Sequence, residues 1–123
     1  MSEKSTVVVL GASPKPERYS NKAVRLLTEK GHHVVPVRPG VDSIEGLPAV
    51  GTLAEVAGEV DTLTVYVSGN VSAGMERAIL DLAPRRVIFN PGAENPQLRT
   101  SLVAAGIETV EACTLVMLGT GQF

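Results

Sequence analysis

Short apolar runs rich in β-branched residues recur along the chain, and glycines, prolines or small polar residues follow most of them. Each run has the length of a strand, and the first four are too continuously apolar for a strand with one face in water. We therefore predict five strands, at Thr6–Leu10, His33–Val37, residues 63–67, Arg86–Phe89 and residues 107–110. Such runs are typical of parallel strands in a sheet that is covered on both faces.

The segments between these runs carry helical periodicity and recognisable helix ends. Residues 21–30 place apolar side chains on one face, follow Ser20 as a candidate N-cap and end at Gly31. Three more helices are predicted: a short one opened by a capping box at residues 52–55, one over residues 72–83 that buries Met75, and one that begins at Asn95-Pro96 and ends at Gly106.

Alternating parallel strands and helices need right-handed crossover connections, which place helices on both faces of the sheet. The prediction is a doubly wound α/β fold: a parallel five-stranded sheet with strand order 3-2-1-4-5 and helices on both faces. Because the chain has 123 residues, 44% of them hydrophobic, and no linker or repeat, we expect residues 1–123 to form a single domain.

Composition and charge exclude several classes of protein. The formal net charge is −2, from 11 Lys and Arg against 13 Asp and Glu, and 3% of the residues are aromatic, which argues against nucleic-acid and membrane partners. The single cysteine and the adjacent His32 and His33 give no metal-ligand spacing. The first apolar run is too short for a membrane span and lacks the layout of a signal peptide, so we expect a cytoplasmic protein.

The segment after the first strand carries the most chemistry, because ligands of open α/β sheets bind beyond the carboxyl ends of the strands, where the strand order reverses. Residues 11–18, called the first loop below, leave a buried strand and lead into a helix, so backbone N–H groups and the helix dipole face an anion there. This region supplies two cations and three neutral donors: Lys15, Arg18, Ser13, Ser20 and Asn21. We therefore predict a phosphate site.

Two positions narrow the choice of phosphate ligand. Ser13 stands where the dinucleotide fingerprint has its second glycine, and no Gly-Lys-Ser/Thr follows Gly11. Arg38 ends the second strand, where an NAD site has an acidic residue, and its planar guanidinium suits a phosphate monoester. The residues leave two candidates open: NADP, with its phosphorylated ribose, and coenzyme A, with a diphosphate and a 3′-phosphate.

Five segments carry a resemblance that covers nearly the whole chain: residues 9–40, 44–56, 60–69, 90–98 and 111–113. In these segments, which include GASPKPERYSNKA, PVRPG and NPGAENPQL, the chain resembles the small stand-alone CoA-binding proteins. Their Rossmann-like fold is similar to the CoA-binding domain of the succinyl-CoA synthetase alpha subunit. The resemblance implies a domain that binds coenzyme A or acyl-CoA by its nucleotide end, without the catalytic partner domains of the synthetase.

The resemblance also implies roles for the loops at the strand ends. Gly11 and Ala12 open the site, Ser13, Pro14, Lys15 and Pro16 line the diphosphate, and Arg18, Tyr19 and Asn21 support it. Arg38, Pro39 and Gly40 lie near the ribose phosphate, Ser68, Gly69 and Asn70 near the adenine or ribose, and Asn90, Pro91 and Gly92 near the pantetheine. Val41 stands where the synthetase-like relatives carry a lysine, so a contact with the 3′-phosphate requires Arg38 to replace it.

The residues at the strand ends include no nucleophile next to a general base. We therefore expect a non-catalytic carrier, sensor or regulatory module rather than an enzyme. For Cys113 we favour packing over a mixed disulfide with coenzyme A. Two alternatives stay open, an NADP-binding reductase-like protein and a protein–protein module with a vestigial nucleotide cleft. The apolar residues 115–118 pack either on the chain's own sheet or in a homodimer.

Overall fold

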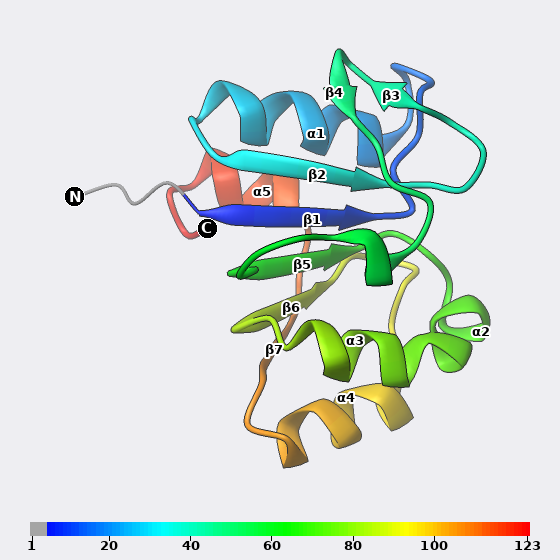
Figure 1. Ribbon diagram of the computed structural model, residues 1–123. Coiled ribbons are helices and arrows are strands. Elements are labelled where there is room, and N and C mark those ends of the chain that lie inside the picture. Colours follow the sequence, from blue (N-terminus) through cyan, green and yellow to red (C-terminus); the bar gives the residue numbers. More distant parts are fainter. Residues whose placement is uncertain (1–4) are drawn as a thin grey trace.

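A five-stranded parallel sheet forms the centre of the computed structural model, which describes residues 5–123 (Figure 1). Its strands are β1 (Thr6–Leu10), β2 (His33–Val37), β5 (Thr62–Val65), β6 (Arg86–Phe89) and β7 (Glu108–Glu111). Every neighbouring pair is parallel, which confirms the predicted α/β sheet. The bounds of β1, β2 and β6 match the prediction, and those of β5 and β7 differ by one or two residues.

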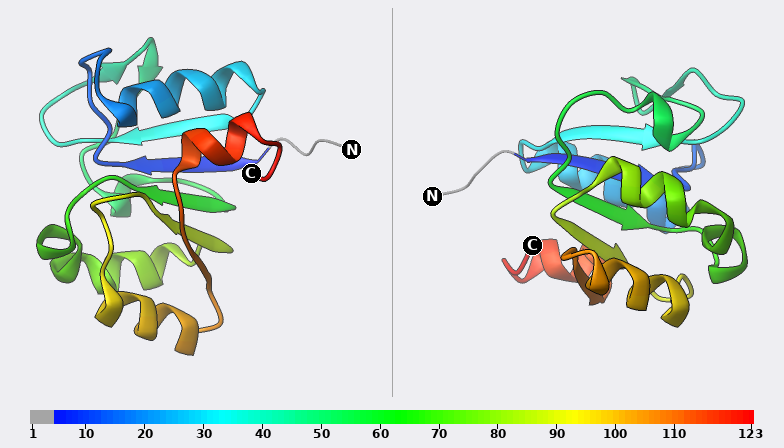
Figure 2. Two further views of the ribbon diagram at one scale, coloured as in Figure 1. Left: turned by 180° about the vertical axis from the view of Figure 1, so that it is seen from behind. Right: turned by 60° about the horizontal axis from the view of Figure 1, so that its bottom comes forward.

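Helices cover both faces of the sheet, as predicted (Figure 2). On one face lie α1 (Tyr19–Glu29) and α5 (Thr114–Gly119), and on the other lie α3 (Glu76–Leu82) and α4 (Pro96–Ala104). The shorter elements are a hairpin of β3 (Ser43–Ile44) and β4 (Leu47–Pro48), the 3₁₀ turns η1 (Leu53–Glu55) and η2 (Ala73–Met75), and α2 (Gly69–Ser72). No helix within residues 5–123 has the length and apolar character that crossing a bilayer requires.

Two predicted helix caps are confirmed. The Asn95 side-chain oxygen accepts a hydrogen bond from the Leu98 N–H at 3.1 Å and so caps α4. The Glu55 carboxylate accepts from the Gly51 and Thr52 N–H groups, at 2.7 and 3.1 Å, in the predicted capping box. That box opens only a single 3₁₀ turn, η1.

Two other helix predictions are corrected. Ser20 is not the N-cap of α1, because the helix begins one residue earlier, at Tyr19, and Arg18 occupies the cap position with an extended backbone. The helix predicted over residues 72–83 starts at Gly69 and is broken into α2, η2 and α3. A 3₁₀ stretch inside a helix narrows its turn locally, so the residues beyond it face a different direction.

Replacing Asn95 by alanine is expected to lower the free energy of unfolding by about 1–2 kcal/mol. The buried amide accepts from the Leu98 N–H and so caps α4, and it also donates to Gly69 O at 3.2 Å and to Ser72 Oγ at 2.9 Å. Its loss therefore leaves the Leu98 N–H without this acceptor and removes two hydrogen bonds between α4 and α2. Urea denaturation measures the change. Gln97→Ala, at an exposed position of the same helix, is the control, and equal stabilities for the two variants would contradict the expectation.

The predicted strand order 3-2-1-4-5 is wrong. The observed order is β2-β1-β5-β6-β7, which numbers the five strands 2-1-3-4-5, so that β2 lies at the edge and β5 pairs with β1. Pro36, in the middle of β2, has no N–H, and its carbonyl oxygen points outward to the Val50 N–H at 3.1 Å. A proline in mid-strand is tolerated at a sheet edge and not in a central strand. The strand order therefore reverses between β1 and β5.

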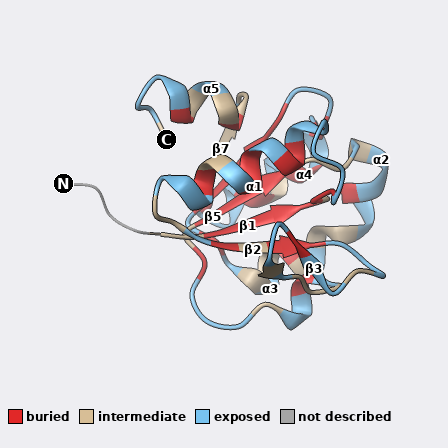
Figure 3. Cartoon of the chain, turned by 90° about the horizontal axis from the view of Figure 1, so that it is seen from above, coloured by how far each residue is buried: buried red, intermediate tan, exposed pale blue. Residues whose placement is uncertain are grey.

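The two central strands β1 and β5 are buried from both sides (Figure 3). Along β1, Val7 and Val9 pack with the core beneath α1 and α5, whereas Val8 and Leu10 pack with the core beneath α3 and α4. This two-sided burial is the reason that the first run contains no polar side chain after Thr6. Because helices fill both faces, ligands reach these strands only at their ends.

Two of the apolar residues 115–118, Leu115 and Leu118, pack on the chain's own sheet, beside α1. Leu118 is buried with the β1 side chains of that face, and the Phe123 ring contacts the His32 ring edge-on, with the centroids 5.3 Å apart. Val116 points outward, with 60% of its surface exposed. His32 directly precedes β2, so it lies at the amino end of that strand, on the side of the sheet opposite the first loop.

Candidate functional site

Two adjoining cavities lie at the carboxyl edge of the sheet, where the strand order reverses. The larger, called the apolar cavity, has a volume of about 590 Å³ and is lined by Leu10, Gly11, Val37, Arg38, Pro39, Gly51, Thr52, Leu53, Val67, Val71, Gly74, Met75 and Ala78. The other, called the polar cavity, has a volume of about 480 Å³ and is lined by Gly11, Ser13, Lys15, Arg18, Tyr19, Ser20, Arg38, Tyr66 and Pro91. Gly11 and Arg38 line both cavities, so they lie where the two cavities adjoin.

Gly11 brings the end of β1 close to the end of β5. Its backbone has a φ of +86°, and a Cβ placed on it would lie 2.9 Å from Val67 Cγ1 and 3.3 Å from the Tyr66 carbonyl carbon. The N–H groups of Gly11 and Ala12 both donate to Val37 O, at 3.1 and 3.2 Å, which ties the first loop to β2. Only glycine fits this position without strain.

The first loop presents its charged side chains to solvent along the polar cavity. Ser13 Oγ accepts a hydrogen bond from the Lys15 N–H at 3.1 Å, and Lys15 O accepts from the Arg18 N–H at 3.1 Å, so the loop turns tightly. Lys15 and Arg18 are exposed and form no ion pair within residues 5–123. Tyr19 is 69% exposed beside them. Two cations that no ion pair engages therefore border this cavity and can attract an anion.

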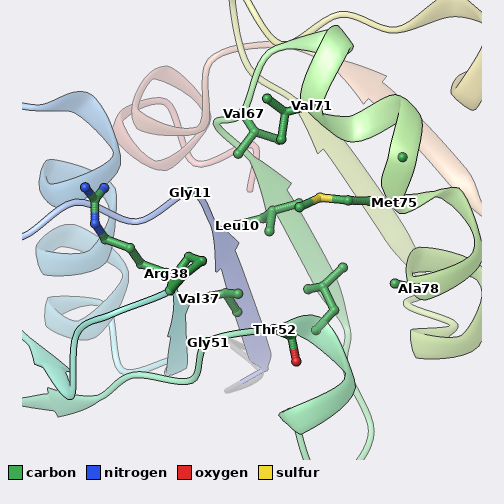
Figure 4. Close-up of a pocket in the computed structure, with 13 residues that line it drawn as sticks. Leu10, Gly11, Val37, Arg38, Gly51, Thr52, Val67, Val71, Met75 and Ala78 are labelled. Carbon is green, nitrogen blue, oxygen red and sulfur yellow. The ribbon is translucent and has the colours of Figure 1, made fainter.

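Arg38 lies between the two cavities. Figure 4 shows its guanidinium leaving the apolar cavity in the direction of α1, and its NH1 donates weakly to Ala12 O, at 3.4 Å. The side chains of Leu10 and Met75 point toward each other across the apolar cavity in the same view. A ligand that occupies both cavities must pass this guanidinium.

Eight of the residues predicted for the site line these two cavities: Gly11, Ser13, Lys15, Arg18, Tyr19, Arg38, Pro39 and Pro91. Ala12 is buried at the start of the first loop. Four other predicted residues lie on the exposed parts of their loops: Pro14, Pro16, Gly40 and Gly92. Asn21 is fully buried, and its amide bonds to Ser13 O, to Glu45 and to Arg25.

Ser68, Gly69 and Asn70 lie apart from both cavities, against the start of α4. A Cβ on Gly69 would come within 2.7 Å of Glu94 O, and these residues line a separate hollow of about 450 Å³ with Glu94 and Asn95. Asn90 is buried as well. Its Nδ2 donates to Thr64 Oγ1 at 2.7 Å, and its Oδ1 accepts from the Thr114 N–H at 2.8 Å. Its side chain therefore joins β5, β6 and α5.

Sequence reasoning missed the lining residues that come from the segment after β5: Tyr66, Val67, Val71, Met75 and Ala78. The predicted strand order separates the end of β5 from the end of β1, so Tyr66 and Val67 are assigned to a strand and Met75 to a helix core, and none of the five is predicted for the site. Met75 is half-buried at the break in the helix and lines the apolar cavity. Pro36 was the available signal, because placing β2 at the edge brings β5 next to β1.

Tyr66 keeps its proton at physiological pH. Its hydroxyl is buried without a hydrogen-bond partner in the described structure, and this burial raises the pKa of Tyr66 to about 12. No side chain that lines either cavity is a carboxylate, a histidine or a cysteine. Nor do residues 5–123 contain a cluster of three potential metal ligands. The site therefore offers donors, cations and apolar contacts.

Comparisons with known proteins connect this architecture to one family. A crystal structure of an uncharacterized protein superposes with a TM-score of 0.91 and 38% identity, over 99% of this chain and 100% of that one. A second structure, cell-free ID.343 from Thermus thermophilus, gives a TM-score of 0.88 and 31% identity, over 98% of this chain and 91% of that one.

A curated relative, the uncharacterized protein YneT of Bacillus subtilis, is 28% identical over 75 residues. The match covers 61% of this chain and 56% of YneT, so it spans little more than half of that protein. The model of a family described as a CoA binding domain matches residues 5–119, which include both cavities and every strand. The chain belongs to this CoA-binding domain family.

Proposed function

We propose that the chain binds coenzyme A or acyl-CoA through its nucleotide and diphosphate end, as a single non-catalytic domain that acts as a carrier, sensor or regulatory module in the cytoplasm. The observation that carries the proposal is the pair of adjoining cavities, one apolar and one polar, at the reversal of the strand order. Family membership supports the same ligand.

The chemistry of the two cavities matches the parts of this ligand. An adenine ring suits the apolar cavity, where Val67, Val71 and Met75 offer aliphatic and thioether contacts. A diphosphate suits the polar cavity, where Lys15 and Arg18 supply charge and the backbone N–H groups of the first loop supply donors. No lining residue is a carboxylate, so none of them repels the negatively charged phosphates of coenzyme A.

The same residues favour binding over catalysis. Tyr66 stays protonated at neutral pH because burial raises its pKa to about 12, and the lining side chains include no carboxylate, histidine or cysteine. A general base next to a nucleophile is therefore not supplied by the lining residues. Of residues 115–118, the exposed Val116 is the one on which a homodimer would rest, and light scattering tests the oligomeric state.

Calorimetric titration with coenzyme A tests the proposal. We expect saturable binding with one site per chain, and weaker binding of NADP, which lacks the pantetheine. Absence of heat with millimolar coenzyme A, in a sample whose circular dichroism shows the α/β fold, would overturn it. Titration with NADP that is tighter than with coenzyme A would favour the reductase-like alternative.

Arg38 is expected to distinguish coenzyme A from dephospho-CoA, which lacks the 3′-phosphate. Because Arg38 lines both adjoining cavities, its guanidinium is placed to pair with a phosphate on the ribose, and such a pair is worth roughly tenfold in affinity. We expect Arg38→Ala to bind both ligands equally and Arg38→Lys to keep part of the preference. Equal affinities for the two ligands in the unmodified protein would contradict this role.

A further inference from the structure

Three side chains that do not line the polar cavity, Asn21, Arg25 and Glu45, hold the first loop in place through hydrogen bonds, which are together called the fastening below. Asn21 Nδ2 donates to Ser13 O at 2.9 Å and to Glu45 Oε2 at 3.0 Å, and its Oδ1 accepts from Arg25 Nε at 2.8 Å. Both amide hydrogens of Asn21 are thereby used. Arg25 NH2 donates in addition to Pro16 O, at 2.9 Å.

This arrangement permits a single orientation of the Asn21 amide. Turned over, the amide would place its NH₂ group against the Arg25 guanidinium and its oxygen against the Glu45 carboxylate, which are two repulsive contacts. The carboxylate of Glu45 on one side and the guanidinium on the other therefore fix the amide, and the amide fixes Ser13.

The consequence for the polar cavity concerns the carbonyl groups of the first loop. A carbonyl oxygen that faces a phosphate repels it, whereas an N–H group attracts it. The oxygens of Ser13 and Pro16 are directed to Asn21 and Arg25, neither of which lines the polar cavity. The fastening thus keeps these two oxygens away from an anion in that cavity.

Glu45 occupies an unusual place for a glutamate. It is the first of two residues, Glu45 and Gly46, that join β3 to β4, and their φ angles are +52° and +77°. A two-residue hairpin turn with both φ angles positive favours Asn-Gly, because asparagine tolerates this region at lower cost. Asparagine at this position has one methylene fewer than glutamate and would not reach Asn21. Glu45 therefore combines a strained backbone with a hydrogen bond to Asn21 that the less strained asparagine could not make.

We propose that Glu45 is a positioning residue for the anion site: through Asn21, the β3–β4 hairpin holds the first loop in the shape that binds a diphosphate. The hairpin lies beside the N-terminal part of α1 and the first loop (Figure 1). This inference rests on the proposed function, since it assigns a role in binding the diphosphate of that ligand.

Two substitutions separate positioning from folding. Glu45→Asn gives the turn its preferred residue and is expected to leave the unfolding temperature unchanged or higher, while it removes the contact with Asn21. Glu45→Gln keeps the reach and an acceptor oxygen. We expect Glu45→Asn to lower the affinity for coenzyme A and for ADP by roughly threefold to tenfold. The affinities of Glu45→Gln should stay within about twofold of those of the unmodified protein.

Adenosine, which has no phosphate, is the ligand that distinguishes the outcomes. Its affinity is expected to be the same in all three proteins, because the apolar cavity lies away from the fastening. Equal ADP affinity in Glu45→Asn and the unmodified protein, or an equal loss for adenosine and ADP, would overturn the positioning role. Failure of the unmodified protein to bind coenzyme A and ADP would instead overturn the proposed function, and the inference with it.

Discussion

Replacing Lys15 and Arg18 together by alanine is expected to weaken the binding of coenzyme A by roughly a hundredfold. Both side chains border the polar cavity and are exposed, and neither forms an ion pair within the described residues. A charged hydrogen bond to phosphate contributes about 1.5–3 kcal/mol, which is about tenfold or more for each cation. Calorimetric titration of the single and double variants measures the effect.

The control for this pair is Lys30→Ala. Lys30 is an exposed cation after the last turn of α1, at the other end of the helix from the first loop, so its removal changes the net charge without touching the cavity. We expect its affinity to equal that of the unmodified protein. Added salt should weaken binding to the unmodified protein more than to the double variant, because the ions screen contacts that the double variant lacks. A loss in Lys30→Ala as large as in Lys15→Ala would refute a local role.

Gly11→Ala is expected to lower the free energy of unfolding by roughly 2–4 kcal/mol, the sum of a left-handed backbone penalty and an overpacking penalty. The methyl group would sit 2.9 Å from Val67 Cγ1 and 3.3 Å from the Tyr66 carbonyl carbon, and backbone atoms cannot move aside as a flexible side chain would. Urea denaturation measures the loss. The remaining folded protein should also bind coenzyme A more weakly, because the ends of β1 and β5 must part.

Gly74→Ala is the matched control for Gly11→Ala. Gly74 lines the same apolar cavity, its φ angle is not positive, and a Cβ there meets no atom within 4 Å. Alanine in η2 should therefore leave the stability unchanged or slightly raise it. A comparable loss in both variants would show that the penalty at Gly11 does not come from the close approach to β5.

The sequence predicts those parts of the fold that depend on local pattern. Thr6–Leu10 and His33–Val37 have the predicted bounds because two-sided burial leaves a continuous apolar run, and Asn95-Pro96 starts α4 because both residues satisfy the needs of a first turn. The first loop and Arg38 were found for the same reason. Each directly follows a strand that the pattern locates.

Neighbour relations between strands are harder to predict, because they depend on which apolar faces meet in the folded chain. Tyr66 and Val67 reach the site only because β5 pairs with β1, and the local signal for that pairing is indirect: Pro36 places β2 at the edge and leaves the neighbouring position to β5. Glu45 was missed for a related reason. Its contact with Asn21 joins residues 24 positions apart, and a turn glutamate carries no distinctive signal in one sequence.

The two edges of the sheet differ in what they offer to another polypeptide. At β2, Pro36 has no donor, its carbonyl oxygen is taken by Val50, and the Val50 carbonyl accepts from Arg38 N–H, so part of that edge is already closed. The β7 edge has no neighbouring strand among the described residues, and exposed glutamates stand at both of its ends, Glu108 and Glu111. Charged side chains on an edge strand oppose its growth into intermolecular sheets. Neutralising these two glutamates is the change by which this fold would become prone to aggregation.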